Sequence, residues 1–462
     1  MSQSSAASGR NRFVYIAAAI AALGGLLFGF DTGIISGALL FIREDLGLSS
    51  FLQSAVVSAI LVGTIVGAGG TGPLADRYGR RTMTLVAAAI FVIGAIGSGL
   101  APNVGFLIGS RVVLGVAVGS STVLVPSYIA EIAPPDIRGT LSALFQLAIT
   151  IGIVVAYLVN YALAEAEAWR WMLGLGAVPA LILGAGMFFL PDSPRWLVSK
   201  DRRDEARAVL QRARDSEQEV NDEMDDIEEA ERQEEAGPGE LLKPWVRPML
   251  VVGIGIAMLQ QLVGINTIIY YAPTIMEATG LDASVSILAT LGVGIVNVVF
   301  TLLALLLIDR VGRKPLLLVG LTGIALALAI LGFGYLLPGL KGVVSYITFA
   351  GLVLYIMSFA ASFGVVLWVV LPELFPLKVR GSAMSVCTIL HWSSNLVVSL
   401  TFLPLIDAVG ETAVFWGYGL ISIGAFIFVY LLMPETKGRS LEQIQRDFRS
   451  ESESLSENPT TT

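Results

Sequence analysis

Long apolar runs recur along the chain, and they restrict its fold more than any other feature. A run of roughly 20 apolar residues is long enough to cross about 30 Å of hydrocarbon as an α-helix. The runs do not alternate polar and apolar residues at every second position, which argues against a β-barrel. The sequence therefore predicts an all-α membrane protein with twelve transmembrane helices. The predicted spans are 13–41, 51–73, 82–101, 104–130, 140–162, 171–190, 247–272, 284–308, 315–337, 345–370, 382–404 and 412–433.

The composition agrees with this class. Of the 462 residues, 55% are hydrophobic and 14% are charged, which is too apolar for a water-soluble domain of this size. The first run is not expected to be a cleaved signal peptide, because its apolar stretch is too long and lacks a small-residue cleavage site. The single cysteine, Cys387, and the single histidine, His391, lie one turn apart on one predicted helix. Two such ligands do not make a metal site, so we expect neither a metal nor a cofactor.

The basic residues of the loops predict the orientation in the membrane. An even number of spans places both termini on the same side. In that topology only Arg43, Arg170 and Lys341 fall on the opposite side, whereas the loops on the side of the termini carry many arginines and lysines. By the positive-inside rule, both termini are expected in the cytoplasm of a multi-pass protein of the cell membrane.

The acidity of the chain is concentrated in one segment. The formal net charge is −8, but residues 201–240 alone hold 16 Asp and Glu against 6 Arg, a net −10 that leaves +2 for the rest. The segment lies between the sixth and seventh spans and is predicted to form solvated, amphipathic cytoplasmic helices. Anionic lipid headgroups would repel it. We expect no nucleic-acid partner.

The loops of the two halves repeat one another. Each of three pairs of loops shares one feature. In order, these are a D-R-x-G-R-[RK] motif, a glutamate seven residues before an arginine, and a proline followed by an acid. The pairs are GPLADRYGRR (72–81) with LIDRVGRKPL (307–316), EIAPPDIRG (131–139) with ELFPLKVRG (373–381), and PDSPRW (191–196) with PETKGR (434–439). Chance would not place three similar charged loops in the same order, so the halves are predicted to be homologous.

This duplication predicts four segments. They are an N-terminal six-helix bundle (1–195), an acidic helical linker (196–246), a C-terminal six-helix bundle (247–437) and a cytoplasmic tail (438–462). Two similar bundles related by an axis along the membrane normal can rock about a site at the midplane, which predicts alternating access.

The charged loops form a candidate cytoplasmic gate, in which acids and arginines pair across or within the halves when that side closes. A simpler interpretation is that the arginines only enforce topology, but it does not explain the acids at matching positions. The candidate gate residues are Asp76, Arg77, Arg80, Glu131, Arg138, Asp192, Asp309, Arg310, Arg313, Glu373, Arg380 and Glu435.

These loop motifs, together with QQLVGIN at 260–266, resemble the sugar porter family of the major facilitator superfamily, over nearly the whole chain. The likeness is greatest to bacterial proton-coupled pentose and hexose symporters, and animal facilitative glucose transporters are more distant. The resemblance implies a major facilitator fold of two pseudo-symmetric six-helix bundles, and a monosaccharide as substrate.

A sugar site needs amides for the hydroxyls and an aromatic surface for the ring. The seventh span supplies Gln260, Gln261 and Asn266 on a broad face that Tyr270 extends. Buried amides also hydrogen-bond between helices for stability. Three within seven residues favour a polar ligand.

The resemblance implies further substrate-binding residues. His391 is a departure, because close relatives carry an amide where this chain has an imidazole, which leaves sugar preference and pH response open. The implied residues are Phe28, Gln146, Asn297, Gly364, Trp368, His391 and Trp392.

Glycines and prolines are predicted to bend four spans around a cavity. Close helix packing is the alternative use of such residues. The residues are Gly24, Gly25 and Gly29 in the first span, Gly115, Gly119 and Pro126 in the fourth, Gly264 and Pro273 in the seventh, and Gly364 in the tenth.

One carboxylate, Asp31, stands in the apolar stretch LLFGFDTGIISG. Such an acid costs about 2.5 to 3.5 kcal/mol at the centre of a membrane helix, so it needs a partner or a task. The only other strongly charged residue well inside a predicted span is Arg111. In the proton-coupled members of the family, the matching residues form an acid–arginine pair on neighbouring helices. A permanent ion pair that only fixes two helices is the alternative.

The sequence thus predicts a proton-coupled monosaccharide symporter, with Asp31 and Arg111 as the coupling pair and a proton as the second ligand. A facilitative sugar uniporter and a sugar sensor that does not transport remain the alternatives. An enzyme is not expected, because no nucleophile, base and orienting group converge. The lipid bilayer is the expected environment, and the expected state is a monomer.

Overall fold

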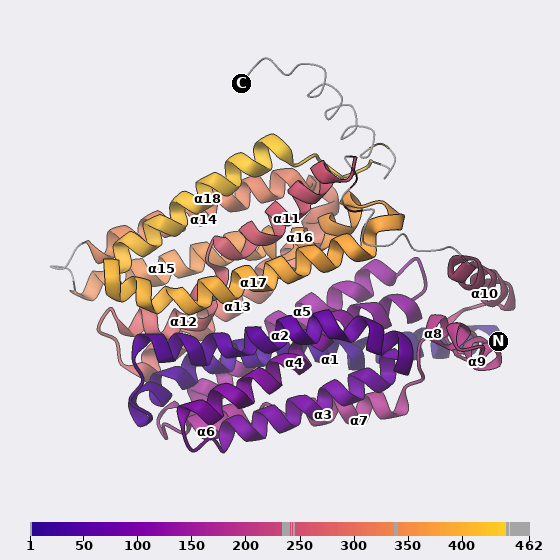
Figure 1. Ribbon diagram of the computed structural model, residues 1–462, viewed down its shortest axis with the longest axis horizontal. Coiled ribbons are helices and arrows are strands. Elements are labelled where there is room, and N and C mark those ends of the chain that lie inside the picture. The colour runs from indigo at the N-terminus through magenta and orange to yellow at the C-terminus, as the bar shows by residue number, and fades with distance from the viewer. Residues whose placement is uncertain are drawn as a thin grey trace, which may run out of the picture. The chain divides into compact units, whose positions relative to one another are not determined.

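The structure, a computed structural model, describes residues 2–232, 241, 243, 245–336, 341–439 and 443. Nearly all of these residues are helical (Figure 1). Twelve of the described stretches are long and apolar enough to cross a membrane. The predicted all-α membrane fold is therefore confirmed. Most of the predicted tail, 438–462, and residues 233–240 of the predicted linker lie outside the described residues.

The contacts divide the chain into two compact units, Met1–Glu234 and Glu235–Thr462, which are named unit 1 and unit 2 here. The assignment of four segments with the boundaries given above stays a prediction. The helices of unit 1 are α1 (Ser2–Asp45), α2 (Ser50–Tyr78), α3 (Arg80–Gly99), α4 (Val104–Ile132), α5 (Arg138–Ala164), α6 (Trp169–Gly174), α7 (Ala177–Phe189), α8 (Pro194–Ser199), α9 (Arg203–Ala213) and α10 (Glu217–Arg232).

In unit 2, α11 packs on α17, and α14 packs on both α15 and α18. Several observed helices extend beyond the predicted apolar runs, because they continue into charged residues such as Asp309 and Arg310. The helices are α11 (Arg247–Leu262), α12 (Ile265–Glu277), α13 (Ala283–Val311), α14 (Arg313–Tyr335), α15 (Lys341–Ala360), α16 (Phe363–Leu374), α17 (Leu377–Val409) and α18 (Glu411–Leu432).

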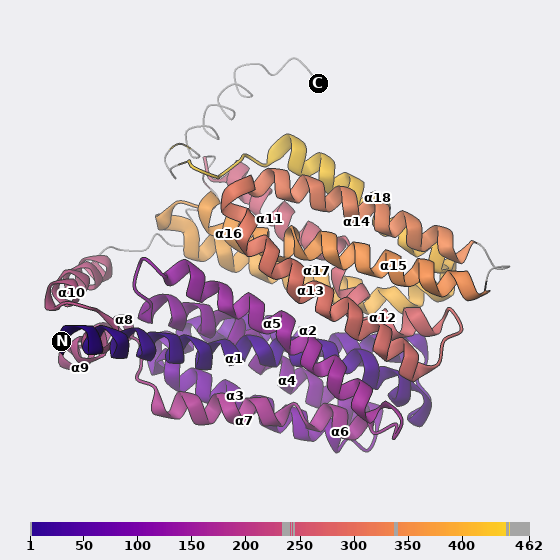
Figure 2. The same cartoon turned by 180° about the vertical axis from the view of Figure 1, so that it is seen from behind.

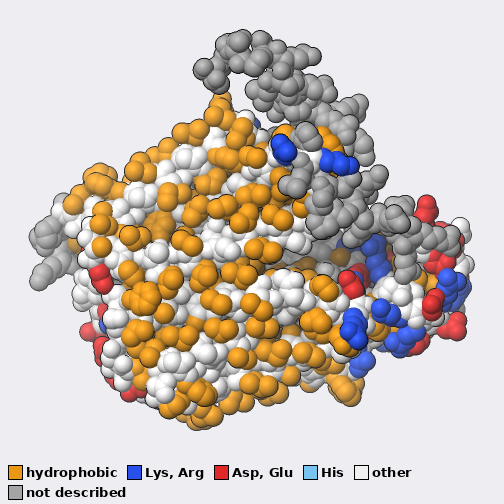
Figure 3. Space-filling model, viewed as in Figure 1, with side chains coloured by type: hydrophobic (Ala, Val, Ile, Leu, Met, Phe, Trp, Pro, Cys, Tyr) orange, Lys and Arg blue, Asp and Glu red, His pale blue; other side chains and the backbone are white. Residues whose placement is uncertain are grey.

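The sides of the bundles expose large apolar side chains, as a surface in contact with lipid requires. Phe189 is 81% exposed, Val319 73% and Leu306 66%. Figure 3 shows hydrophobic side chains along the bundles, whereas most of the visible Lys, Arg, Asp and Glu side chains lie at the end of α8, α9 and α10, and a few Asp and Glu side chains lie at the opposite end. A contiguous apolar surface of this extent is stable only in a non-aqueous environment.

The glycines of α1 and α4 lie where neighbouring helices approach closely. Both helices run without a break, α4 even through Pro126, and the predicted bending of the first and fourth spans stays a prediction. A Cβ atom on Gly29 would overlap the main chain of Ile149 in α5, and one on Gly115 would overlap the carbonyl of Ile60 in α2. Small residues let helix backbones approach closely in a membrane, and this explains the tight α1–α5 and α2–α4 pairs.

The seventh and tenth spans are broken as predicted, although not always at the predicted residue. Between α11 and α12, Gly264 adopts a left-handed conformation with φ +92° and ψ 23°. In the tenth span the break falls at Ala361 and Ser362, just before Gly364, and Pro273 lies inside α12 without ending it. A further break, between α6 and α7, was not predicted.

The linker helices α8, α9 and α10 form a small apolar cluster of their own beside the N-terminal end of the chain (Figures 1 and 2). Trp196 packs there with Leu210, Val220 and Ile227. Arg214, which follows α9, donates from Nη1 to the carbonyl of Ile132 at the end of α4 (2.9 Å) and forms an ion pair with Glu223 of α10. Within unit 1, the acidic linker helices are thereby joined to the end of α4.

Candidate functional site

The break at Gly264 brings together two amides that a continuous helix would separate. Gln261 lies in the last turn of α11 and Asn266 in the first turn of α12, and Asn266 Nδ2 donates to Gln261 Oε1 at 2.6 Å. The break frees carbonyl groups that other residues satisfy. The Tyr355 hydroxyl donates to the Val263 carbonyl (2.9 Å), and Thr267 Oγ1 donates to the Gly264 carbonyl (2.7 Å).

A chain of hydrogen bonds continues from this pair. Gln261 Nε2 lies 3.2 Å from Gln260 Oε1 and 3.1 Å from His391 Nε2, a residue of α17. Gln260 Nε2 donates to the Phe363 carbonyl at 2.8 Å, and His391 Nδ1 lies 3.2 Å from the Ala257 carbonyl. Gln260, Gln261 and His391 are each at most 5% exposed. Unit 2 therefore contains a buried polar network in an apolar bundle.

Two indole rings border this network. The ring centroids of Trp368 and Trp392 lie 5.4 Å and 5.0 Å from the His391 ring, both edge to face. Trp392 is buried, whereas Trp368 is 38% exposed and follows Gly364 by one turn of α16. The site thus combines amide donors and acceptors with an aromatic surface.

The remaining residues implied for a sugar site are distributed over both units. Tyr270 is buried in α12, and Asn297 is 8% exposed in α13. Phe28 in α1 and Gln146 in α5 belong to unit 1, where both are half-buried. Whether these residues bind sugar stays a prediction.

Unit 1 pairs the two charges that the sequence places inside spans. Arg111 Nη1 and Nη2 donate to the two carboxylate oxygens of Asp31 at 3.3 Å and 3.2 Å, in a bidentate geometry. Arg111 Nε donates to the Val56 carbonyl of α2 at 2.8 Å. The Arg111 side chain is fully buried and that of Asp31 is 4% exposed, so water does not screen the pair.

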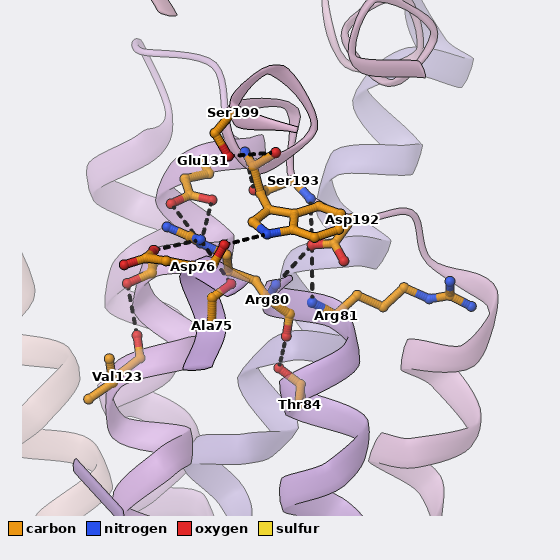
Figure 4. Close-up of polar contacts among 12 residues, drawn as sticks. Ala75, Asp76, Arg80, Arg81, Thr84, Val123, Glu131, Asp192, Ser193 and Ser199 are labelled. Carbon is orange, nitrogen blue, oxygen red and sulfur yellow. Dashed lines mark hydrogen bonds and ion pairs between the residues drawn. The ribbon is translucent and has the colours of Figure 1, made fainter. Parts of the chain in front are cut away.

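The charged loops of unit 1 form a cluster around Arg80. Its guanidinium lies between Asp76 (2.9 Å) and Glu131 (3.2 Å), whereas Arg81 extends away from them (Figure 4). Asp192 Oδ1 accepts hydrogen bonds from the main-chain N–H groups of Arg80 (2.9 Å) and Arg81 (3.2 Å). Burial raises the pKa of the Asp192 carboxyl, and these N–H donors oppose that shift. The cluster joins the ends of α2, α3, α4 and α7.

Unit 2 repeats this cluster around Arg313. Its guanidinium pairs with Asp309 (3.2 Å) and Glu373 (2.9 Å), and the Glu435 carboxylate accepts from the N–H groups of Arg313 (3.1 Å) and Lys314 (3.0 Å). The conformation before each arginine is also repeated, with φ +95° at Gly79 and +104° at Gly312.

The other four predicted gate residues divide into two pairs. Arg138 and Arg380 each donate to the carbonyl five residues earlier in the chain, at 3.4 Å and 3.1 Å. Arg77 and Arg310 are exposed, and among the described residues we find no ion pair of their side chains. The within-unit clusters therefore contain eight of the twelve predicted residues, and the four remaining arginines form none of these ion pairs.

Residues 17–448 match the family described as sugar (and other) transporter, which is nearly the whole chain. The chain belongs to this family of sugar transporters. It is 49% identical over 428 residues to the putative metabolite transport protein YwtG of Bacillus subtilis, with 93% of each chain covered. It is 44% identical over 440 residues to the D-xylose transporter of Levilactobacillus brevis, with 95% of this chain and 96% of that one covered.

A solved structure agrees with this membership. The chain resembles the proton:xylose symporter XylE, of the major facilitator superfamily, bound to 6-bromo-6-deoxy-D-glucose. The TM-score is 0.78 at 30% identity, over 95% of this chain and 100% of that one. XylE is from E. coli. The predicted family and major facilitator fold are confirmed, and the family is one of transporters rather than enzymes.

The sequence interpretation missed several groups that build the transporter's polar network. The Tyr355 hydroxyl binds the Val263 carbonyl and the Phe363 carbonyl binds Gln260, both at helix breaks, whereas the Ala257 carbonyl binds His391 from within α11. A tyrosine inside an apolar span was the only available signal, because a main-chain carbonyl occurs at every residue.

Proposed function

We propose that this transporter imports a monosaccharide together with a proton, by alternating access, as a monomer in the cell membrane with both termini in the cytoplasm. The observation that carries the proposal is the buried, bidentate pair of Asp31 and Arg111. A downhill uniporter needs no such acid. The similar protein XylE is a proton:xylose symporter, which supports the same interpretation.

Asp31 is the proton-binding member of the pair, because arginine stays charged in proteins. Protonation removes the negative charge from the carboxyl group and with it the attraction to both Arg111 nitrogens. Arg111 keeps its bond to the Val56 carbonyl, so α1 is the helix that is released from α4. Loss of the proton restores the pair and returns the transporter to its starting state.

The sugar binds at the polar network of unit 2, where Gln260, Gln261 and Asn266 offer donors and acceptors to hydroxyl groups. Trp368 and Trp392 supply the apolar surface for the ring. Asn297, Tyr270 and Gly364 of the same unit complete the proposed site there, and Phe28 and Gln146 stay predicted sugar-binding residues of unit 1. The charged clusters around Arg80 and Arg313 act as a gate that stabilises the closed cytoplasmic side.

The proton supplies enough energy for concentrative uptake. One charge that crosses 100 mV contributes about 2.3 kcal/mol, and one pH unit adds about 1.4 kcal/mol. Together these terms support a sugar concentration several hundredfold higher inside the membrane than outside.

Asp31→Asn tests the proposal in proteoliposomes. The variant should lose uphill sugar accumulation and sugar-driven proton uptake but keep exchange of labelled sugar across the membrane, because the site in unit 2 is intact. Asp45→Asn is the matched control, since Asp45 lies at the exposed end of α1 in an ion pair with Arg170 (2.9 Å). Uphill accumulation by Asp31→Asn would contradict the coupling role. Net sugar uptake by the wild type without proton uptake would instead identify a uniporter, and binding without uptake or exchange would identify a sensor.

A further inference from the structure

The two ring nitrogens of His391 face partners with opposite requirements. Nδ1 lies 3.2 Å from the Ala257 carbonyl, which only accepts hydrogen bonds, so Nδ1 must carry a hydrogen. Nε2 lies 3.1 Å from Gln261 Nε2, which only donates, so Nε2 must present its lone pair. Together these contacts describe a neutral imidazole with its single N–H at Nδ1.

The orientation of the Gln261 amide is supported independently from its other side. Gln260 Nε2 donates to the Phe363 carbonyl, which leaves Gln260 Oε1 as an acceptor facing Gln261. Gln261 must therefore turn its NH2 group toward Gln260 and His391, and its oxygen toward Asn266 Nδ2. Two main-chain carbonyls, at Ala257 and Phe363, thus determine the direction of every hydrogen bond in the network.

This arrangement commits both hydrogens of Gln261 Nε2 to protein partners. A hydroxyl group that approaches Gln261 meets only the oxygen, so at this position the ligand must donate. His391 itself has no nitrogen left for a ligand, and the edges of Trp368 and Trp392 limit the rotation of its ring.

We propose that His391 is a positioning residue that, as the neutral imidazole protonated on Nδ1, holds the Gln261 amide so that its oxygen accepts a hydrogen bond from a sugar hydroxyl. The inference rests on the proposed sugar-binding function. It assigns His391 a role through Gln261 and no direct contact with sugar, and it predicts that only an acceptor at the Nε2 position can replace the imidazole.

The single histidine of the chain makes the tautomer directly observable. Protein that carries no polyhistidine tag is labelled with ¹⁵N-histidine and measured by NMR in lipid nanodiscs at neutral pH, without sugar. One nitrogen with an attached hydrogen, identified as Nδ1, and one bare nitrogen are expected. A hydrogen on Nε2, alone or together with one on Nδ1, would overturn the proposal.

A charge substitution tests the contact itself. In Gln261→Glu the partner of Nε2 becomes a carboxylate that only accepts, so Nε2 should gain a hydrogen and both nitrogens should give protonated signals. Asn297→Asp is the control, because it adds an acid to the same unit at a residue outside the contacts of His391. The same bare-nitrogen signal in Gln261→Glu as in the wild type would contradict the contact.

Binding of D-xylose, D-glucose and D-galactose, measured by calorimetry, tests the consequence for the site. In His391→Gln, Oε1 reaches the place of Nε2 and accepts from Gln261, so the Kd should stay within about threefold of wild type. In His391→Asn the side chain ends at the place of Nδ1 and leaves Gln261 without its acceptor, so binding should weaken about tenfold or more. Equal losses in both variants, or none in His391→Asn, would refute the positioning role. Failure of the wild type to bind any of the three sugars would refute the proposed function, whereas the NMR result on the tautomer is obtained without sugar.

Discussion

Arg111 uses all three of its guanidinium nitrogens on buried partners, two on the Asp31 carboxylate and one on the Val56 carbonyl. A buried ion pair contributes little net stability, because desolvation offsets the attraction between its members. Removal of one member is nevertheless severe, since it leaves the other charge buried and unpaired.

Arg111→Gln should therefore lower the free energy of unfolding by about 3–5 kcal/mol. Adding Asp31→Asn to this variant should restore part of the loss, because no uncompensated carboxylate remains. Arg170→Gln breaks the exposed pair with Asp45 and should cost about 1 kcal/mol or less. Denaturant unfolding in detergent, followed by tryptophan fluorescence, measures all three. A double variant less stable than Arg111→Gln would contradict this account.

At the residue scale, the sequence predicts contacts between rare side chains and not contacts with the main chain. Asp31 and Arg111 are the only strong charges well inside predicted spans, so each was the obvious partner for the other. The bond from His391 to the Ala257 carbonyl had no comparable signal, because its acceptor is a group that every residue carries.

At the scale of elements, the break between α11 and α12 determines the geometry of the amide site. Gly264→Ala should destabilise the protein by about 1–2 kcal/mol, because an L-residue is strained at φ +92°. It should also weaken sugar binding, since Asn266 would no longer reach Gln261. Gly280→Ala is the matched control, with φ +95° and open space around it in the turn after α12. A similar loss of sugar affinity in both variants, measured by calorimetry, would exclude a specific role for the break.

The glycines of α1 lead to a different expectation. Gly29→Ala should cost about 1–3 kcal/mol or more, because the added methyl group overlaps the main chain of Ile149 and forces α1 and α5 apart. Gly69→Ala in α2 meets nothing within 4 Å and should be neutral or slightly stabilising, since alanine favours helix over glycine. Thermal unfolding compares the two, and equal midpoints would contradict the packing role.

The existence and order of the spans could be predicted from apolar length, but the effect of each glycine could not. Gly264 and Gly29 are both glycines in apolar spans, and only one of them ends a helix. The difference lies in what faces each residue, namely a left-handed turn at Gly264 and a neighbouring backbone at Gly29. The sequence alone does not show which group faces a given glycine.

At the scale of the whole molecule, the duplication places the same charged cluster in both units. Arg80→Gln and Arg313→Gln should each lower the initial rate of sugar uptake into proteoliposomes several-fold, and by similar factors, because each arginine joins two acids. Arg77→Gln removes an exposed arginine outside the cluster and should transport at nearly the wild-type rate. An equal loss in Arg77→Gln would favour a general effect of positive charge on these loops.

The duplication itself could be predicted, since three charged loops recur in the same order. The apolar cluster of the acidic linker could not be predicted in the same way. Residues 201–240 have a net charge of −10, which indicates a solvated segment. The charge gives no sign that Leu210, Val220 and Ile227 pack with Trp196 of a neighbouring helix.

The glycines that precede α3 and α14 restrict which substitutions the chain can accept. At Gly79 the Asp192 carboxylate occupies the volume that a Cβ atom would need, and at Gly312 the Glu435 carboxylate does the same. Neither glycine tolerates a side chain, because a Cβ atom would overlap the carboxylate and the positive φ of +95° and +104° would strain an L-residue even beside a shorter acid. The same constraint therefore fixes one glycine in each unit at the point where a charged loop meets the next helix.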